Sequence, residues 1–94
     1  MALVFEWDPK KARRNLTIHG VSFDEAGTVF QDVLSKTIED PLHSEDEERS
    51  VLLGHSHRNR LLVVVHTERG DRIRLISARL ATNKERVIYE ESKK

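Results

Sequence analysis

The segment RLLVVVHTERGDRIRLISA, residues 60–78, decides the fold class of this chain. Its two halves are rich in β-branched and aliphatic residues and therefore predict two strands. Gly70 and Asp71, which lie between them, are typical of a tight two-residue hairpin turn. The run from Leu61 to Val65 is apolar on both faces, which predicts a central strand covered on both sides.

Shorter strand-like segments precede this hairpin and complete an antiparallel sheet. The loop at residues 57–59 links the first half of the hairpin to an earlier strand, and Pro41 marks a loop further upstream. The predicted strands cover residues 3–7, 34–39, 49–55, 60–68 and 72–78, and an acidic loop covers residues 40–47.

Three helices are predicted from their capping residues. Asp8 is placed as an N-cap with Pro9 at the first helical position, and Gly20 follows the helix that ends near His19. Two capping boxes, Ser22-Phe23-Asp24-Glu25 and Thr82-Asn83-Lys84-Glu85, begin a second and a third helix. The sequence therefore predicts the α+β order β-α-α-β-β-β-β-α.

Length and composition limit the classes of protein that this chain can form. Ninety-four residues suffice for a single domain, 1–94, with one modest core. The chain has no cysteine, which excludes disulfides, thiolate zinc sites and a cysteine nucleophile and fits a reducing cytoplasm. The N-terminus carries no signal-peptide pattern, and the longest apolar run is too short to cross a membrane.

The net charge of zero conceals a partition along the chain. Residues 24–48 hold nine acids and one base, whereas residues 49–86 hold nine bases and three acids. A chain so divided can present a basic face to a polyanion and an acidic face to a basic partner. Alternatively, the fold interleaves the two segments and their fields cancel.

Arginines alternate with aliphatic residues along the second half of the hairpin. Arg72 and Arg74 lie on the face opposite Ile73 and Leu75, and Arg79 follows where the strand ends. Guanidinium groups bind phosphate oxygens bidentately and keep their charge, which suits RNA binding and phosphoryl chemistry. The structural alternative is cross-strand pairing with Glu68 or Glu48.

A second polar set lies on the first helix. Lys11, Asn15 and His19 are four residues apart and share one helix face. The alternative is a solvated face that ends in a histidine at the helix C-terminus, a position that suits a cation.

The other histidines give a weaker signal. His43 lies in a loop before four consecutive acids, and a histidine that titrates near neutrality can act as a general acid or base. The alternative is an ordinary surface histidine. His55 and His57 share one strand face, but their spacing lacks the helical support of a metal site, so neither a metal nor a cofactor is expected.

An ordered set of short motifs runs from residue 5 to about residue 90. It comprises FEWDPxK at 5–11, Asn15, HGVSF at 19–23, Glu25-Ala26, Val29-Phe30, His43-Ser44, Glu48-Arg49, Gly54, LVV at 62–64, Arg72 and ISAR at 76–79. Together these motifs resemble the BrnT toxin family. Members often have a lysine just before the His-Gly pair, where this chain has Ile18.

The resemblance implies a small ribonuclease with a RelE-like fold, the toxin of a type II toxin–antitoxin pair. Its implied partners are an RNA substrate and a BrnA-like antitoxin. It would contact operator DNA only through the antitoxin. Its implied assembly is either a homodimer or a 2:2 heterotetramer with the antitoxin. Residue types then suggest roles in metal-independent RNA cleavage. The catalytic candidates are Arg79, Arg74, Lys11, His19, His43 and Glu48, and the RNA-binding candidates are Arg72, Arg49, Tyr89 and Asn15.

Two functions from other classes compete with this interpretation. A non-enzymatic module would dock its basic face on an acidic protein and cut nothing. A dimeric nucleic-acid-binding regulator is disfavoured, because the helix after Gly20 carries Asp24, Glu25 and Asp32, which phosphate would repel.

Overall fold

Strands β4 (Leu61–Arg69) and β5 (Arg72–Leu80) form the predicted hairpin at the centre of the molecule. The chain is seen in a computed structural model that describes residues 3–38 and 49–91. Gly70 in the turn has a φ of 61°, a left-handed conformation that glycine adopts without steric cost. The hairpin prediction is therefore confirmed.

Three further strands complete a five-stranded sheet of order β1-β5-β4-β3-β2. These are β1 (Val4–Glu6), β2 (Lys36–Ile38) and β3 (Ser50–His55). The sheet is mixed, because β1 pairs in parallel with β5 while the other pairs are antiparallel. The expected purely antiparallel sheet was wrong on this point, since nothing local in a three-residue strand indicates which distant strand it will join.

The strand expected over residues 34–39 begins later than predicted. Asp32 Oδ1 accepts a hydrogen bond from the Leu34 backbone N–H at 2.9 Å, which holds residues 33 and 34 in a turn. The strand therefore starts at Lys36. The expected acidic loop at residues 40–47, together with His43 and Glu48, lies outside the described residues.

The helices begin at the predicted N-caps, and the first also ends at its predicted Gly20. Helix α1 (Pro9–His19) starts where Asp8 accepts from the Lys10 N–H, and Gly20 ends it with a φ of 70°. Helix α2 (Phe23–Thr28) starts at Ser22 and continues into a short 3₁₀ helix, η1 (Val29–Gln31). Helix α3 (Asn83–Glu91) has the full capping box, because Thr82 and Glu85 each accept from the other's backbone N–H.

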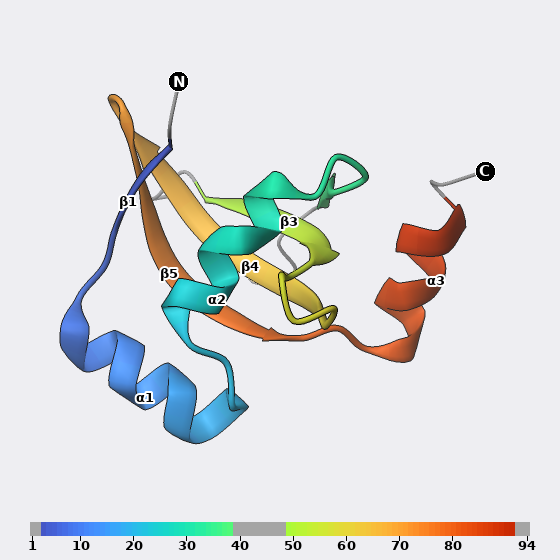
Figure 1. Ribbon diagram of the computed structural model, residues 1–94, viewed down its shortest axis with the longest axis horizontal. Helices are drawn as coiled ribbons and strands as arrows, with labels where there is room; N and C mark the ends of the chain where they lie inside the picture. The colour runs from blue at the N-terminus through green and yellow to red at the C-terminus, as the bar shows by residue number, and fades with distance from the viewer. Residues whose placement is uncertain (1–2, 39–48, 92–94) are drawn as a thin grey trace.

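Two apolar layers lie on opposite faces of the sheet. Val64, Leu62 and Leu75 join α2 in one cluster, whereas Val63 and Leu61 pack with Tyr89 of α3 in the other. In Figure 1, α2 lies across the front of the sheet, α1 lies at the lower left beside β5, and α3 stands at the right, after the end of β5. The central position of β4, with apolar residues on both faces, confirms the prediction from the run at 61–65.

A β-bulge interrupts the pairing of β4 with β5. Val65 pairs with Ser77 and His66 pairs with Leu75, so Ile76 is an extra residue on β5. The bulge allows both Leu75 and Ala78 to enter the same apolar cluster beneath α2. It lies just beyond the end of β1, where β5 becomes an edge strand.

Within residues 3–38 and 49–91, none of the helices combines the length and the apolar character that crossing a lipid bilayer requires.

Candidate functional site

Arg72 and Arg74 lie on the face of β5 that turns away from α1 and α2. Their strand neighbours Ile73 and Leu75 are buried beneath the helices, which confirms the predicted alternation. Both guanidinium groups approach Glu6 of β1: Arg74 Nη1 lies 3.2 Å from Oε2, and Arg72 Nη1 lies 3.7 Å from Oε1. The side chain of Arg74 remains 33% exposed and that of Arg72 59% exposed, so a phosphate can reach both.

The pairing with Glu68, which the sequence left open as an alternative, does not occur. Glu68 lies opposite Ile73 in the sheet and therefore points to the other face. Glu6 takes its place because β1 joins β5 in parallel and sets Glu6 beside Arg74. The alternative pairing with Glu48 falls outside the described residues.

Arg79 lies further along β5 and is bound by a carboxylate of α3. Its Nη1 and Nη2 donate to Glu85 Oε1 and Oε2 at 2.8 and 2.9 Å. These hydrogen bonds lower the pKa of Glu85 to about 2 and raise that of Arg79. The Arg79 side chain is still 35% exposed, so the two hydrogen bonds to Glu85 hold the guanidinium in place without covering it.

A groove of about 240 Å³ runs between α1 and the edge of β5. Lys11 and His19 line it from the helix, and Ile76 and Ser77 line it from the strand. The predicted shared face of Lys11, Asn15 and His19 is therefore confirmed. The groove also contains Arg14, which the sequence analysis missed although it lies three residues after Lys11 on the same side of the helix.

Asn15 holds α1 on β5. Its Nδ2 donates to the carbonyls of Ala78 and Val21 at 2.8 and 2.9 Å, and its Oδ1 accepts from the Ala78 N–H at 3.1 Å. The side chain is buried, and both of its donors are occupied. Asn15 therefore has a structural role at the groove: it positions the helix that carries Lys11 and His19.

Tyr89 lies on the side of the sheet near β3, two strands away from β5. Its hydroxyl donates to Asp32 Oδ2 at 2.7 Å, and its ring packs edge-on against His55. Burial and the bond to Asp32 raise the pKa of Tyr89 to about 12. Asp32 also accepts from the His55 backbone N–H, so this cluster joins η1, β3 and α3.

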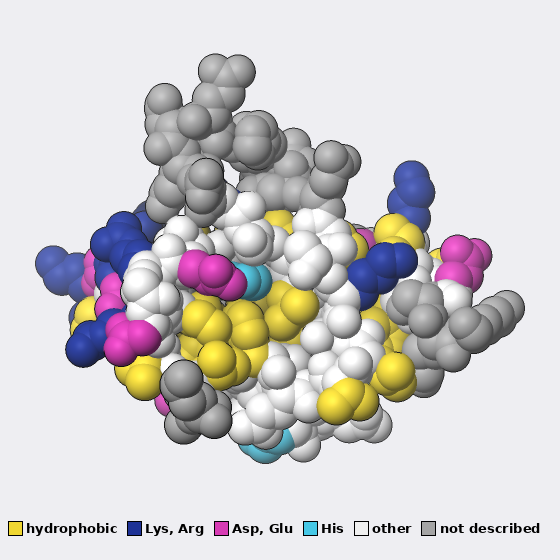
Figure 2. Space-filling model, turned by 90° about the horizontal axis from the view of Figure 1, so that it is seen from above, with side chains coloured by type: hydrophobic (Ala, Val, Ile, Leu, Met, Phe, Trp, Pro, Cys, Tyr) yellow, Lys and Arg dark blue, Asp and Glu magenta, His cyan; other side chains and the backbone are white. Residues whose placement is uncertain are grey.

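One acid of the segment 24–48 binds a base of the segment 49–86 within the described residues. Glu25, 2% exposed, binds Arg60 through two hydrogen bonds and accepts from the Ser56 hydroxyl at 2.7 Å. The hydrogen bonds from Arg60 lower the pKa of Glu25 even though burial opposes the shift. At the left margin of Figure 2, Lys and Arg side chains likewise lie among Asp and Glu side chains, while hydrophobic side chains gather in the middle of that face. For Glu25 and Arg60, both in the part of the chain that the structure describes, the charges meet and cancel.

The predicted site residues thus fall into separate groups, and members of two of these groups lie close together in the sequence of β5. Ser77 lines the groove, with Arg74 three residues before it and Arg79 two residues after it. At about 3.3 Å per residue along a strand, these arginines lie within roughly 10 Å of Ser77 along the chain. Tyr89 belongs to neither group, Arg49 precedes β3 and is partly buried, and His43 and Glu48 are not described.

Metal ligation finds no support in the part of the chain that the structure describes, where no three His, Asp or Glu side chains gather around a common point. His57, one of the two histidines considered, instead has its Nδ1 3.2 Å from the Thr28 hydroxyl.

The fold and the groove define a small α+β protein with basic side chains beside the edge of a strand. The family model described as "Ribonuclease toxin, BrnT, of type II toxin–antitoxin system" matches residues 7–85. The chain therefore belongs to the BrnT family of ribonuclease toxins, and membership implies an antitoxin partner.

A solved structure shares the fold. The crystal structure of the Brucella abortus ribonuclease toxin BrnT aligns with a TM-score of 0.66 and 19% sequence identity, covering 87% of this chain and 100% of that chain. At this identity the likeness concerns the fold alone. No curated protein sequence gave a significant match.

Proposed function

We propose that this chain is an endoribonuclease that needs no metal, inhibits translation and growth, and is neutralised in the cytoplasm by a BrnA-like antitoxin. Its fold is then of the RelE-like type, and operator DNA is met only through the antitoxin. One observation carries the proposal: the groove that holds Lys11 and His19 opens on the same stretch of β5 that carries Arg74 and Arg79.

The chemistry follows from these side chains. A base removes the proton of the RNA 2′-OH, the 2′-oxygen bonds to phosphorus, the bond to the 5′-oxygen breaks, and an acid protonates that leaving oxygen. Arg74, Arg79 and Lys11 supply the positive charge that the crowded phosphate requires, so a metal ion is not needed for that task.

Proton transfer needs a separate pair of groups. His19 lines the groove and is our first candidate; His43 and Glu48 remain candidates for the acid and the base. Arg72 and Arg49 are candidates for contacts with RNA outside the scissile phosphate. Tyr89, the other RNA-binding candidate, has its hydroxyl bound to Asp32, and we assign it to the fold.

The experiment combines RNA cleavage in EDTA with growth on regulated expression. Arg79→Ala and His19→Asn should each lower the cleavage rate by about a hundredfold or more and relieve growth arrest, because the first removes a charge that stabilises the phosphate and the second removes a proton-transfer group. Arg86→Ala, an exposed position on α3, serves as the matched control and should cleave normally. Undiminished cleavage by folded Arg79→Ala and His19→Asn would remove this site from the mechanism.

A second function is favoured by one observation. Arg72, Arg74 and Arg79 all form ion pairs with carboxylates of the chain itself. In a degenerate toxin, such ion pairs would keep the arginines occupied, so that they no longer bind RNA. Such a non-enzymatic module would bind the antitoxin but leave RNA intact in EDTA. The same cleavage assay on the unaltered chain separates the two functions.

A further inference from the structure

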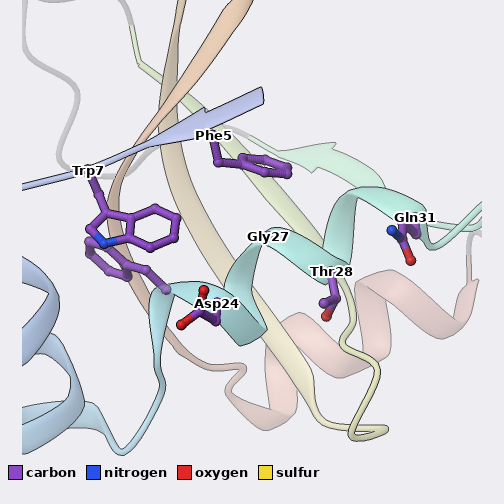
Figure 3. A pocket seen from close by; sticks show the side chains of 7 residues that line it. Phe5, Trp7, Asp24, Gly27, Thr28 and Gln31 are labelled. Atoms are coloured by element: carbon purple, nitrogen blue, oxygen red, sulfur yellow. The ribbon is translucent and has the colours of Figure 1, made fainter. Parts of the chain in front are cut away.

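A hollow of about 330 Å³ lies between the N-terminal segment of β1 and Trp7 on one side and α2 on the other. Figure 3 shows Phe5 and Trp7 reaching into it from the N-terminal segment, with Asp24 and Thr28 on α2 and Gln31 beyond them on η1. Gly27 forms part of the lining, and a Cβ at this position would meet the Phe5 ring at 3.4 Å. The hollow and the groove share no lining residue.

The hollow is aromatic with a single negative charge. Among its lining residues in the described part of the chain, Asp24 is the only charged one. Asp24 is exposed, and no hydrogen bond or ion pair of its carboxylate occurs within residues 3–38 and 49–91. Arg13 lines an adjoining hollow of about 170 Å³ but forms no ion pair with Asp24 there. The hollow thus offers an open carboxylate beside two aromatic rings.

This chemistry selects its ligand. The methylene stem of an arginine packs on apolar walls, its planar guanidinium stacks on an indole ring, and its fork binds a carboxylate bidentately. RNA is disfavoured, because the phosphates that flank an inserted base would face Asp24 without a lining cation to offset it.

We propose that this hollow receives an arginine side chain of the antitoxin. Two adjoining hollows extend the surface on either side: one reaches half-exposed Leu16 on α1, and the other reaches His55 and His57. A continuous trough along α2 therefore accepts a segment of the partner with a basic anchor in its middle. The inference rests on the antitoxin that family membership implies, and it is independent of where RNA is cut.

Trp7 makes the hollow directly observable, because it is the chain's only tryptophan. Titrating the purified chain with N-acetyl-arginine amide should change its fluorescence saturably, whereas the neutral analogue N-acetyl-citrulline amide should not. Equal responses to the two compounds, or no response to either, would overturn the proposal.

The second measurement uses the antitoxin, defined as the protein whose co-expression relieves growth arrest or, if the chain arrests nothing, the product of the adjacent open reading frame. Asp24→Asn should weaken the complex by about tenfold or more, because an isosteric amide cannot form the charged fork. Asp71→Asn, the same change in the exposed hairpin turn, is the control and should bind as the unaltered chain does.

RNA cleavage by the same variants separates this inference from the proposed function. Asp24→Asn should cleave RNA at the unaltered rate. Unchanged affinity for the antitoxin in Asp24→Asn contradicts the inference, and so does tighter RNA binding that quenches Trp7. Absence of RNA cleavage in the unaltered chain would overturn only the proposed function.

Discussion

Asn15 and Ala78 form two hydrogen bonds with each other across 63 residues of sequence. The side-chain amide of Asn15 bonds to the backbone of Ala78 in place of a neighbouring strand. Ala78 lies on β5 beyond the end of β1, where the strand has a free edge. The amide satisfies the backbone N–H and carbonyl of Ala78 as a neighbouring strand would. Helix α1, which carries Lys11 and His19, is thereby fixed against the strand that carries Arg79.

Asn15→Ala should lower the free energy of unfolding by about 2–4 kcal/mol, because it leaves buried backbone groups of Ala78 and Val21 unpaired. Urea denaturation checks the value. Thr17→Ala, on the exposed side of the same helix, is the matched control and should change stability by less than about 1 kcal/mol. Similar losses for the two variants would show that Asn15 does not fix the helix.

Glu25→Gln should also destabilise the fold. The substitution removes the charge that Arg60 is arranged to bind, and Glu25 is nearly inaccessible to water. Breaking a pair of this kind costs about 2–4 kcal/mol once the partial exposure of Arg60 is considered. Thermal unfolding beside Asp24→Asn, an exposed neighbour, provides the comparison; equal melting temperatures in the two variants would contradict the assigned role.

Substitution by alanine should affect stability differently at two glycines. In Gly54→Ala the new Cβ would lie 2.9 Å from Ser35 Cβ and 3.0 Å from Val29 Cγ1, so the tightly packed segment must shift at a cost of about 1–3 kcal/mol. In Gly27→Ala the nearest atoms lie at 3.4 Å, and alanine favours the helix by up to about 1 kcal/mol. Denaturation midpoints should therefore fall for Gly54→Ala and stay near the unaltered value for Gly27→Ala.

The Arg79–Glu85 pair predicts a dependence of stability on pH. Its hydrogen bonds lower the pKa of Glu85 from the ordinary 4.5 to about 2, so the folded state favours the charged form. The pair's contribution is complete above the ordinary pKa and is lost as the pH falls toward about 2. The stability gap between the unaltered chain and Glu85→Gln should accordingly shrink between about pH 5 and about pH 2. A gap that stays constant over this range would show that the pair does not shift the pKa.

Tyr89→Phe tests whether this residue acts on RNA or on the fold. Losing the hydroxyl that binds Asp32 should reduce the free energy of unfolding by about 1–2 kcal/mol. Cleavage of RNA should be unchanged, because the hydroxyl is engaged two strands away from the groove. A large loss of cleavage with unaltered stability would return Tyr89 to the site.

Local signals in the sequence predicted local structure. Asp8, Gly20 and Gly70 mark the ends of elements through bonds and dihedral angles of near neighbours, and the structure has each of them as predicted. Prediction from local signals fails for the side chain of Glu25. Ser22 does accept from the Glu25 N–H, but the Glu25 carboxylate binds Arg60, 35 residues away, instead of completing the capping box.

The same distinction explains the candidate site. Helical spacing was enough to bring Lys11 and His19 together, and strand alternation was enough to place Arg72 and Arg74 on one face. Spacing within an element does not reveal partners contributed by other elements. Glu6, Glu85 and Ala78 became neighbours of these residues only through the order of the strands and the docking of the helices.

The parallel pairing of β1 with β5 has a consequence for synthesis on the ribosome. Val4 finds its partner only at Arg72, and the groove beside α1 needs Ile76 and Ser77. A nascent chain that still lacks these residues holds its lysine and histidine on a helix with nothing opposite them. The groove proposed to cut RNA is therefore completed only after β5 has been synthesised.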